Sequence, residues 1–166
     1  MLKGINYMNE KTEIDKEYID YYWLRKDLYS KSKHLKFGYG QLPSGFTEGI
    51  CNEIYKMKTM KYTKENKDKG ADSEDKDGNL VEIKCTQEKG SSVTINRSED
   101  YKYLLWINFD YENDTIRIKK FNKKDVDEVI QKASSKNDRV TINLNSIKNI
   151  ILEESFKFNK LHLEKS

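Results

Sequence analysis

Hydrophobic residues recur along the chain at two different spacings, and each spacing is typical of a different secondary structure. Where apolar and aromatic residues lie three or four positions apart, we predict helices over residues 13–35, 46–61 and 123–134. We predict strands at LVEIKCT (80–86), where apolar and polar residues alternate, and at YLLWINF (103–109) and TIRIKKF (115–121). The predicted strands therefore occupy the middle of the chain, and the predicted helices flank them.

The segments between these elements complete the outline. GYGQLPSG (38–45) is typical of a loop, and DGN (77–79) is typical of the turn of a β-hairpin whose second strand is 80–86. Near the C-terminus the pattern is ambiguous: RVTINLN (139–145) fits a strand, and SIKNIILEE (146–154) fits a short helix. The order helix, helix, hairpin, strand, strand, helix predicts an α/β or α+β fold in which helices pack on one mixed central sheet.

Length and composition indicate a folded single domain. The 166 residues suffice for one core, and no repeat or Pro/Gly-rich linker divides them. Charged residues make up 36%, but the 11% of aromatic residues and the clear apolar runs argue against disorder. The net charge is only +3, so a polyanionic partner such as nucleic acid would need a local basic surface.

The sequence also predicts where the protein works. No apolar stretch approaches the roughly 20 residues that cross a bilayer, and MLKGINYMNEK lacks the apolar segment of a signal peptide. The two cysteines, Cys51 and Cys85, fit neither a metal-binding spacing nor a disulfide framework. We therefore expect a cytoplasmic protein that has no membrane partner.

Candidate chemistry lies at the predicted hairpin. Alternate residues of strand 80–86 face the core, so Glu82 and Lys84 project together from its other face, about 6 to 7 Å apart. Asp72 begins the partner strand and would approach Glu82. Since Mg²⁺ prefers oxygen ligands, Asp72, Glu82 and the Ile83 carbonyl would hold an ion that polarises a phosphate and activates a water. Lys84 would position that water or neutralise charge on the phosphate. The alternative is a Glu/Lys pair that only solvates an exposed sheet.

Two groups of polar residues are candidates for contact with DNA. The lysine-rich connector before Asp72, which includes Lys61 and Lys64, would touch phosphates without reading sequence. The tract KGSSVTINR (89–97) offers hydrogen bonds to base edges, and its arginine can bind a guanine through two of them. Its candidate residues are Lys89, Ser91, Ser92, Thr94, Asn96 and Arg97. A solvated helix face and an ordinary polar loop are the alternative interpretations.

Asp72, nine further residues and then Glu82-Ile83-Lys84 resemble the PD-(D/E)xK nuclease signature, with Ala71 in place of the motif's proline. LPSGFTEGICNEIY resembles the helix that precedes the motif in small type II restriction endonucleases. The segment from Lys89 to Phe121 resembles the one that follows it in one subgroup of them. The resemblance covers roughly residues 38–125.

The resemblance implies a restriction-endonuclease-like fold with an αβββαβ core. We expect one nuclease domain over 1–166, with its core at about 38–135 and a helical segment at 1–36. The implied activity is Mg²⁺-dependent hydrolysis of phosphodiester bonds in double-stranded DNA at a short specific sequence. The implied partners are a second copy of the chain, in a homodimer, and a cognate DNA methyltransferase encoded alongside it.

Two questions stay open at this point. The resemblance implies Glu48 as a further acidic metal ligand, whereas helical geometry favours Glu53, which falls on the apolar stripe of its helix and would need a partner. The chain could also be a structure-specific nuclease of the same superfamily, such as a junction resolvase or repair nuclease, or a non-catalytic DNA-binding domain of the same fold. The polar tract 89–97 favours base reading, and the intact Asp72, Glu82 and Lys84 set favours catalysis.

Overall fold

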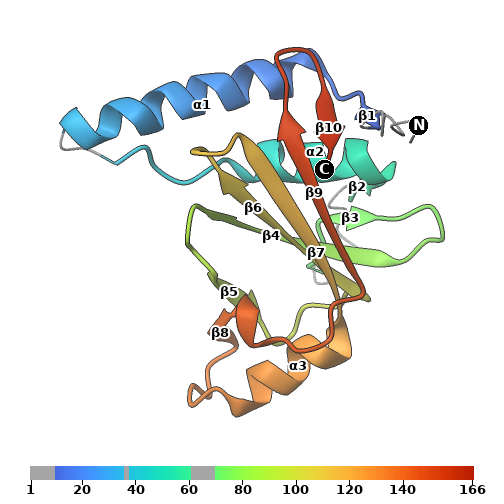
Figure 1. The fold of residues 1–166 in the computed structure, drawn as a ribbon. Helices are drawn as coiled ribbons and strands as arrows, with labels where there is room; N and C mark the ends of the chain where they lie inside the picture. The colour runs from blue at the N-terminus through green and yellow to red at the C-terminus, as the bar shows by residue number, and fades with distance from the viewer. Residues whose placement is uncertain (1–9, 36–37, 61–69) are drawn as a thin grey trace, which may run out of the picture.

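The computed structural model describes residues 10–35, 38–60 and 70–166, and a mixed sheet forms their centre (Figure 1). Its eight strands are β1 (Lys11–Thr12), β2 (Lys58–Thr59), β3 (Ser73–Glu74), β4 (Leu80–Gln87), β6 (Tyr103–Asp110), β7 (Thr115–Asn122), β9 (Leu152–Phe158) and β10 (Leu163–Lys165). They lie in the order β1-β10-β9-β7-β6-β4-β3-β2. β4 and β6 are parallel, and all the other neighbours are antiparallel. The predicted α+β class with a mixed central sheet is confirmed.

The remaining elements cover the two faces of this sheet. Helices α1 (Lys16–Leu35) and α2 (Ser44–Tyr55) lie on one face (Figure 1). On the other face lie helix α3 (Lys123–Lys132) and a separate antiparallel ribbon, made of β5 (Ser92–Asn96) and β8 (Arg139–Asn143). A single 3₁₀ turn, η1 (Leu144–Ser146), follows the ribbon. Within the described ranges, no helix is both long and apolar enough to cross a membrane.

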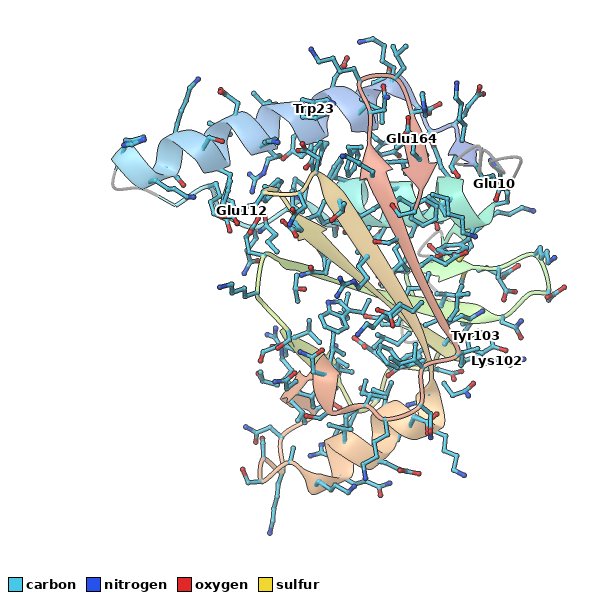
Figure 2. The ribbon with its side chains drawn as sticks, viewed as in Figure 1. Glu10, Trp23, Lys102, Tyr103, Glu112 and Glu164 are labelled. Carbon is cyan, nitrogen blue, oxygen red and sulfur yellow. The ribbon has the colours of Figure 1, made fainter. Side chains whose placement is uncertain are left out.

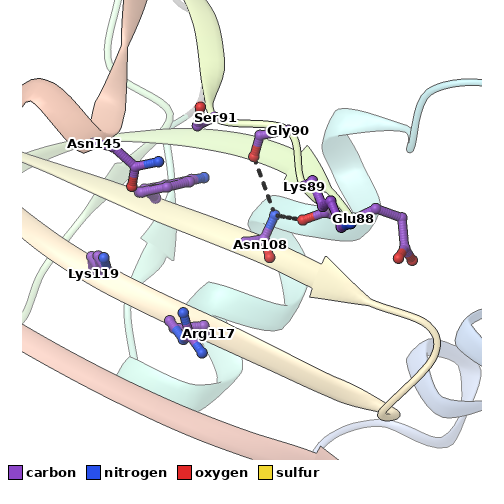
Figure 3. A pocket seen from close by; sticks show the side chains of 9 residues that line it. Glu88, Lys89, Gly90, Ser91, Asn108, Arg117, Lys119 and Asn145 are labelled. Atoms are coloured by element: carbon purple, nitrogen blue, oxygen red, sulfur yellow. Dashed lines mark hydrogen bonds between the residues drawn. The ribbon is translucent and has the colours of Figure 1, made fainter.

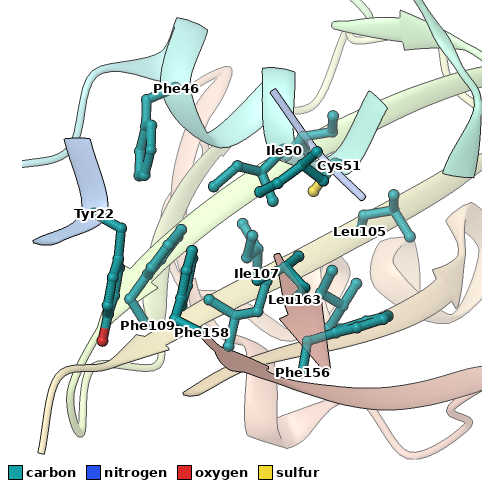
Figure 4. Packing of buried hydrophobic residues seen from close by; sticks show 14 of the residues in the cluster. Tyr22, Phe46, Ile50, Cys51, Leu105, Ile107, Phe109, Phe156, Phe158 and Leu163 are labelled. Carbon is teal, nitrogen blue, oxygen red and sulfur yellow. The ribbon is translucent and has the colours of Figure 1, made fainter. Parts of the chain in front are cut away.

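The first core lies between the sheet and the helices α1 and α2 (Figure 4). Alternate residues of β6, such as Ile107 and Phe109, enter it and are fully buried. The ring of Tyr22 on α1 stacks on that of Phe158, with 3.6 Å between the ring centroids. The indole of Trp23 donates a hydrogen bond to the Asn159 carbonyl at the β9–β10 turn, beside which Figure 2 labels Trp23. The N-terminal helix is therefore part of the same hydrophobic core as the C-terminal strands.

The second core lies between the opposite face of the sheet, the ribbon and α3. The other alternate residues of β6, Leu104 and Trp106, enter it together with Phe121 of β7. The ribbon contributes its inward side chains, Val93, Ile95, Val140 and Ile142. Because both faces of β4 and β6 are covered over much of their length, these two strands form the rigid middle of the fold.

Some predicted elements are wrong at their ends or in their type. The predicted helix 46–61 ends at Tyr55, because Lys56 adopts a left-handed conformation with a φ of 54° and its N–H bonds back to Asn52. SIKNIILEE is not a helix: after η1, its last residues form the start of β9, which pairs with β7. A chain that is ambiguous alone becomes a strand when a neighbour supplies backbone partners.

The connection between the two parallel strands differs from the implied core order. The αβββαβ order places a helix between its third and fourth strands. Residues 88–102, which join β4 to β6, instead contain strand β5, and helix α3 comes only after β7. The ribbon strand therefore occupies the position in the chain where the resemblance implies a helix.

Candidate active site

The β3–β4 hairpin fixes the position of Asp72. The predicted turn is confirmed: the Asp75 carboxylate accepts hydrogen bonds from the N–H groups of Asp77 and Asn79, and closes it. The Asp72 N–H then donates to the Val81 carbonyl at 3.1 Å. Two residues further along β4, the hydrogen-bond partner is a side chain instead of the backbone: Asp72 Oδ2 accepts from the Ile83 N–H at 2.7 Å.

Beyond this side-chain contact, no described strand pairs with the second half of β4 at this edge. β3 pairs only with the first two residues of β4, Leu80 and Val81, in the part of the chain that is described. Since the N–H and C=O of one strand residue point to the same edge, the Ile83 carbonyl also faces Asp72. The predicted oxygen set of Asp72, Glu82 and Ile83 is therefore gathered around this edge.

Glu82 and Lys84 lie together on one face of β4, as their alternation predicts. Glu82 is only 2% exposed, and its Oε1 lies 2.5 Å from the Lys84 Nζ. The Lys84 side chain keeps 22% of its surface exposed. Glu82 Oε2 is buried and has no hydrogen-bond partner among the described residues. The Glu82 carboxyl group also shares a side-chain hydrogen bond with Asp72, so the buried Oε2 atom is the part of it that lacks a donor or a cation.

Burial and repulsion shift the charges of this group. Burial, followed by the nearby Asp72 charge, raises the pKa of Glu82 to about 8, although Lys84 opposes the shift. Burial also raises the pKa of Asp72, against the Ile83 hydrogen bond, the charge of Lys84 and a side-chain hydrogen bond with Glu82. Burial disfavours the charged form of Lys84, but Glu82 outweighs it and raises the Lys84 pKa. The Lys84 ammonium thus offsets only part of the electrostatic cost of placing the Asp72 and Glu82 carboxylates together.

Of the two helix carboxylates, Glu48 is the one whose charge interacts with Asp72 and Lys84. It is half-buried on α2. Its pKa is raised first by burial and then by the charge of Asp72, while Lys84 lowers it. Glu53 points elsewhere, because its Oε2 accepts a hydrogen bond of 2.6 Å from the Asp15 N–H before α1. The structure therefore brings the residue implied by the resemblance, rather than the one favoured by helical geometry, close to Asp72.

Glu99 supplies a further carboxylate that no sequence motif marks. Its charge raises the pKa of both Glu82 and Lys84, and its Oε2 is buried without a partner in the described ranges. Gly70 makes room for it: a Cβ there would lie 2.7 Å from the Glu99 Cγ, and the Gly70 φ is +69°. Only glycine adopts that backbone conformation without strain. A glycine two residues before Asp72 was the one available signal of a close approach.

The acidic groups can accommodate a hard cation but do not enclose one. Among the described residues, no three His, Cys, Asp or Glu side chains are grouped closely enough to hold a metal ion. Two carboxylates and a carbonyl fit Mg²⁺ nevertheless, because this ion keeps several of its waters. The unpartnered Glu82 oxygen and the raised pKa of Glu82 are both features that a bound cation would relieve.

A groove of about 630 Å³ runs beside the site. Its lining includes Gln41 from the loop before α2, Lys84 from β4, Thr94 from β5 and Thr141 from β8. Lys84 thus connects the buried acidic group with open solvent. Lys84 is therefore the residue shared by the acidic group and the groove.

The predicted DNA-binding tract is divided among three positions. Ser92 and Thr94 line the groove that contains Lys84. Lys89 and Ser91 line a smaller pocket of about 180 Å³, on the other side of the turn after β4 (Figure 3). There the Asn108 amide fixes the turn by donating to the carbonyls of Glu88 and Gly90 (Figure 3).

The last two residues of the tract make internal contacts. The Arg97 guanidinium donates to the carbonyls of Ser135 (2.6 Å) and Asn137 (3.0 Å), and so holds the loop before β8. The Asn96 amide donates to Glu99 Oε1 at 2.6 Å. Neither side chain is free to read a base in this arrangement. Lys61 and Lys64 lie outside the described residues.

Comparison of the sequence with protein-family models and with curated proteins gives no match.

The raised pKa of Glu82 predicts how stability changes with pH. The folded protein keeps a proton up to about pH 8 that the unfolded chain releases near its ordinary pKa of 4.5. The stabilisation that this proton contributes is complete below the unfolded-state pKa of 4.5 and is lost as pH rises through the folded-state pKa of about 8. We expect the free energy of unfolding of metal-free protein to fall between about pH 5 and pH 8, and to fall less in Glu82→Gln.

Urea unfolding in EDTA at three pH values measures this difference. Glu74→Gln makes the same chemical change on the neighbouring strand and should follow the wild-type slope. If the free energy of unfolding falls with pH by the same amount in wild type and Glu82→Gln, the raised pKa does not belong to Glu82.

Proposed function

We propose that the protein is a Mg²⁺-dependent endonuclease that hydrolyses phosphodiester bonds of double-stranded DNA at a short specific sequence, as a type II restriction endonuclease of the PD-(D/E)xK kind. The observation that carries the proposal is the gathering of Asp72, Glu82 and Lys84 at the open edge of β4, beside a groove. A purely solvating Glu/Lys pair would be exposed, whereas Glu82 is almost completely buried.

The residues divide the work between the cation and the phosphate. Asp72, Glu82 and the Ile83 carbonyl would hold Mg²⁺, with Glu48 as a further acidic group. When bound, the ion supplies Lewis-acid polarisation of the phosphate and lowers the pKa of a water. Lys84 stays protonated beside Glu82, and its ammonium would stabilise the negative charge that develops on the phosphate.

The groove supplies the second requirement, which is access for a polymer. It is open to solvent and passes Lys84, so a DNA backbone lying in it would bring a phosphate to the ammonium. The proposal includes a homodimer, because cutting both strands of a duplex at one site is served by two active sites. It also includes a methyltransferase that protects the same sequence in the host.

Incubation of plasmid DNA with the purified protein in Mg²⁺ tests the function. Discrete fragments, absent when EDTA is added, are the expected result. A smear, or preference for branched DNA, would favour a structure-specific nuclease instead. Intact DNA at all Mg²⁺ concentrations would contradict the proposal and favour a non-catalytic DNA-binding domain.

A further inference from the structure

The β5–β8 ribbon has one apolar face and one polar face. Val93, Ile95, Val140 and Ile142 point inward and are buried against the sheet and α3. The outward side chains form three cross-strand pairs: Ser92 with Asn143, Thr94 with Thr141, and Asn96 with Arg139. None of these six side chains is acidic or large and apolar.

The ribbon holds this polar face in a fixed position. Its inward residues pack on Phe121 of β7 and on Val126 and Ile130 of α3. Arg97 bonds to the loop that leads into β8, and the Leu144 N–H donates to the Ser91 carbonyl at the other end. Both ends of the ribbon are therefore tied, so its outward side chains keep their spacing.

The polar face also adjoins the proposed catalytic group. Ser92, Thr94, Arg139 and Thr141 line the same groove as Lys84. Arg139 is exposed, and its guanidinium has no ion pair or hydrogen bond to another described residue. In this respect it differs from Arg97, whose donors bind two carbonyls. Relative to the described residues, Arg139 is thus an unpaired bidentate donor in the lining of the groove.

We infer that the outward face of the β5–β8 ribbon enters the major groove of duplex DNA and reads base edges there, with Arg139, Thr141 and Asn143 of β8 as the principal readers. This inference rests on the proposed function, and it adds the surface that selects the sequence. It assigns base reading to β8, which lies outside the polar tract 89–97.

The dimensions of the ribbon suit this role. A major groove about 12 Å wide admits a two-stranded β-ribbon. Outward residues on one strand are about 6.8 Å apart, so the three rows extend over about 14 Å. Since base pairs are about 3.4 Å apart along a strand, the ribbon spans about four of them. Each protomer of the proposed dimer would then read a short half-site.

The side chains suit the base edges as well. The arginine fork matches the O6 and N7 acceptors of guanine, and asparagine matches the N6 and N7 groups of adenine. The hydroxyl pair of Thr94 and Thr141, 3.3 Å apart, can donate or accept. The absence of carboxylates on this face of the ribbon means that it does not repel phosphates.

Selection from a pool of random-sequence duplexes in Ca²⁺, which supports binding without cleavage, tests the inference. We expect wild type to enrich a specific sequence and Arg139→Ala to lose preference at one base pair of it, by roughly 10-fold. Arg139→Lys should bind random DNA as wild type does but lose the same preference, because lysine keeps the charge and lacks the fork. Lys132→Ala on α3 removes an equal charge away from the groove and should enrich the wild-type sequence.

The possible results separate this inference from the proposed function. If Arg139→Ala and Arg139→Lys both enrich the wild-type sequence while wild type cuts DNA, the ribbon inference is overturned and the nuclease stands. Wild-type binding without any enriched sequence also overturns the inference. If wild type neither binds nor cuts duplex DNA, the proposed function itself fails.

Discussion

Replacing Asp72 by asparagine should lower the rate of DNA cleavage in Mg²⁺ by at least about a thousandfold while the protein stays folded. Asparagine keeps a side-chain oxygen that can still accept the Ile83 hydrogen bond, so the hairpin retains its geometry. What disappears is the negative charge of one of the carboxylates that act on Lys84. A site that holds Mg²⁺ with only two carboxylates cannot lose one without losing most of its affinity for the ion.

Single-turnover cleavage of one plasmid measures this effect, with thermal unfolding as the check on the fold. Asp77→Asn is the matched control, because it makes the same chemical change at an exposed residue in the turn of the same hairpin. We expect the control to cut DNA at the wild-type rate. If Asp72→Asn cleaves DNA at a rate within tenfold of wild type, the motif is not part of the catalytic mechanism, whether or not the groove binds DNA.

The parts of the fold that follow from local patterns could be predicted from the sequence. Strand β6 is an almost continuous apolar run, β7 partly alternates, and a short turn joins them, so each carries its own signal. The end of α2 at Tyr55 depends on a left-handed Lys56, a residue type that gives no warning of that conformation. β9 becomes a strand because β7 lies beside it, and a partner about 30 residues away leaves no local pattern.

The candidate site divides in the same way. Asp72, Glu82 and Lys84 belong to one hairpin, so their spacing was enough to predict that they meet. Glu99 lies in the connection between β4 and β6, and Arg139 lies in the ribbon. Their positions depend on contacts between segments that are distant in sequence. Arg97 could not be distinguished from Arg139 by sequence, because the two carbonyls that bind it come from a loop almost 40 residues later.

The burial of α2 explains why Glu48 can approach Asp72 although it lies off the apolar stripe. Helical geometry favours Glu53 only if α2 has one buried stripe and a solvated opposite side. The helix is instead buried more broadly, since Thr47 and Cys51 are buried in addition to Phe46 and Ile50. A carboxylate outside the apolar stripe can therefore still face the interior of the protein.

Glu48→Gln should lower the cleavage rate by about 10- to 100-fold, the range expected for a residue that supports a metal site without being its main ligand. Its charge acts on Asp72 and Lys84, so removing it weakens the attraction for the cation while leaving Asp72 and Glu82 in place. Raising the Mg²⁺ concentration should therefore restore part of the rate. The melting temperature should change little, because glutamine fills the same space.

Glu53→Gln, on the same helix, is the matched comparison. Its side-chain oxygen can still accept the Asp15 hydrogen bond, so both the rate and its dependence on Mg²⁺ should remain those of wild type. Measuring the two variants side by side over a range of Mg²⁺ concentrations decides between them. If the effects are exchanged, Glu53 is the acidic partner of Asp72. If both variants cut DNA at the wild-type rate, α2 supplies no catalytic group, and Glu99 is then the remaining candidate for a third carboxylate at the site.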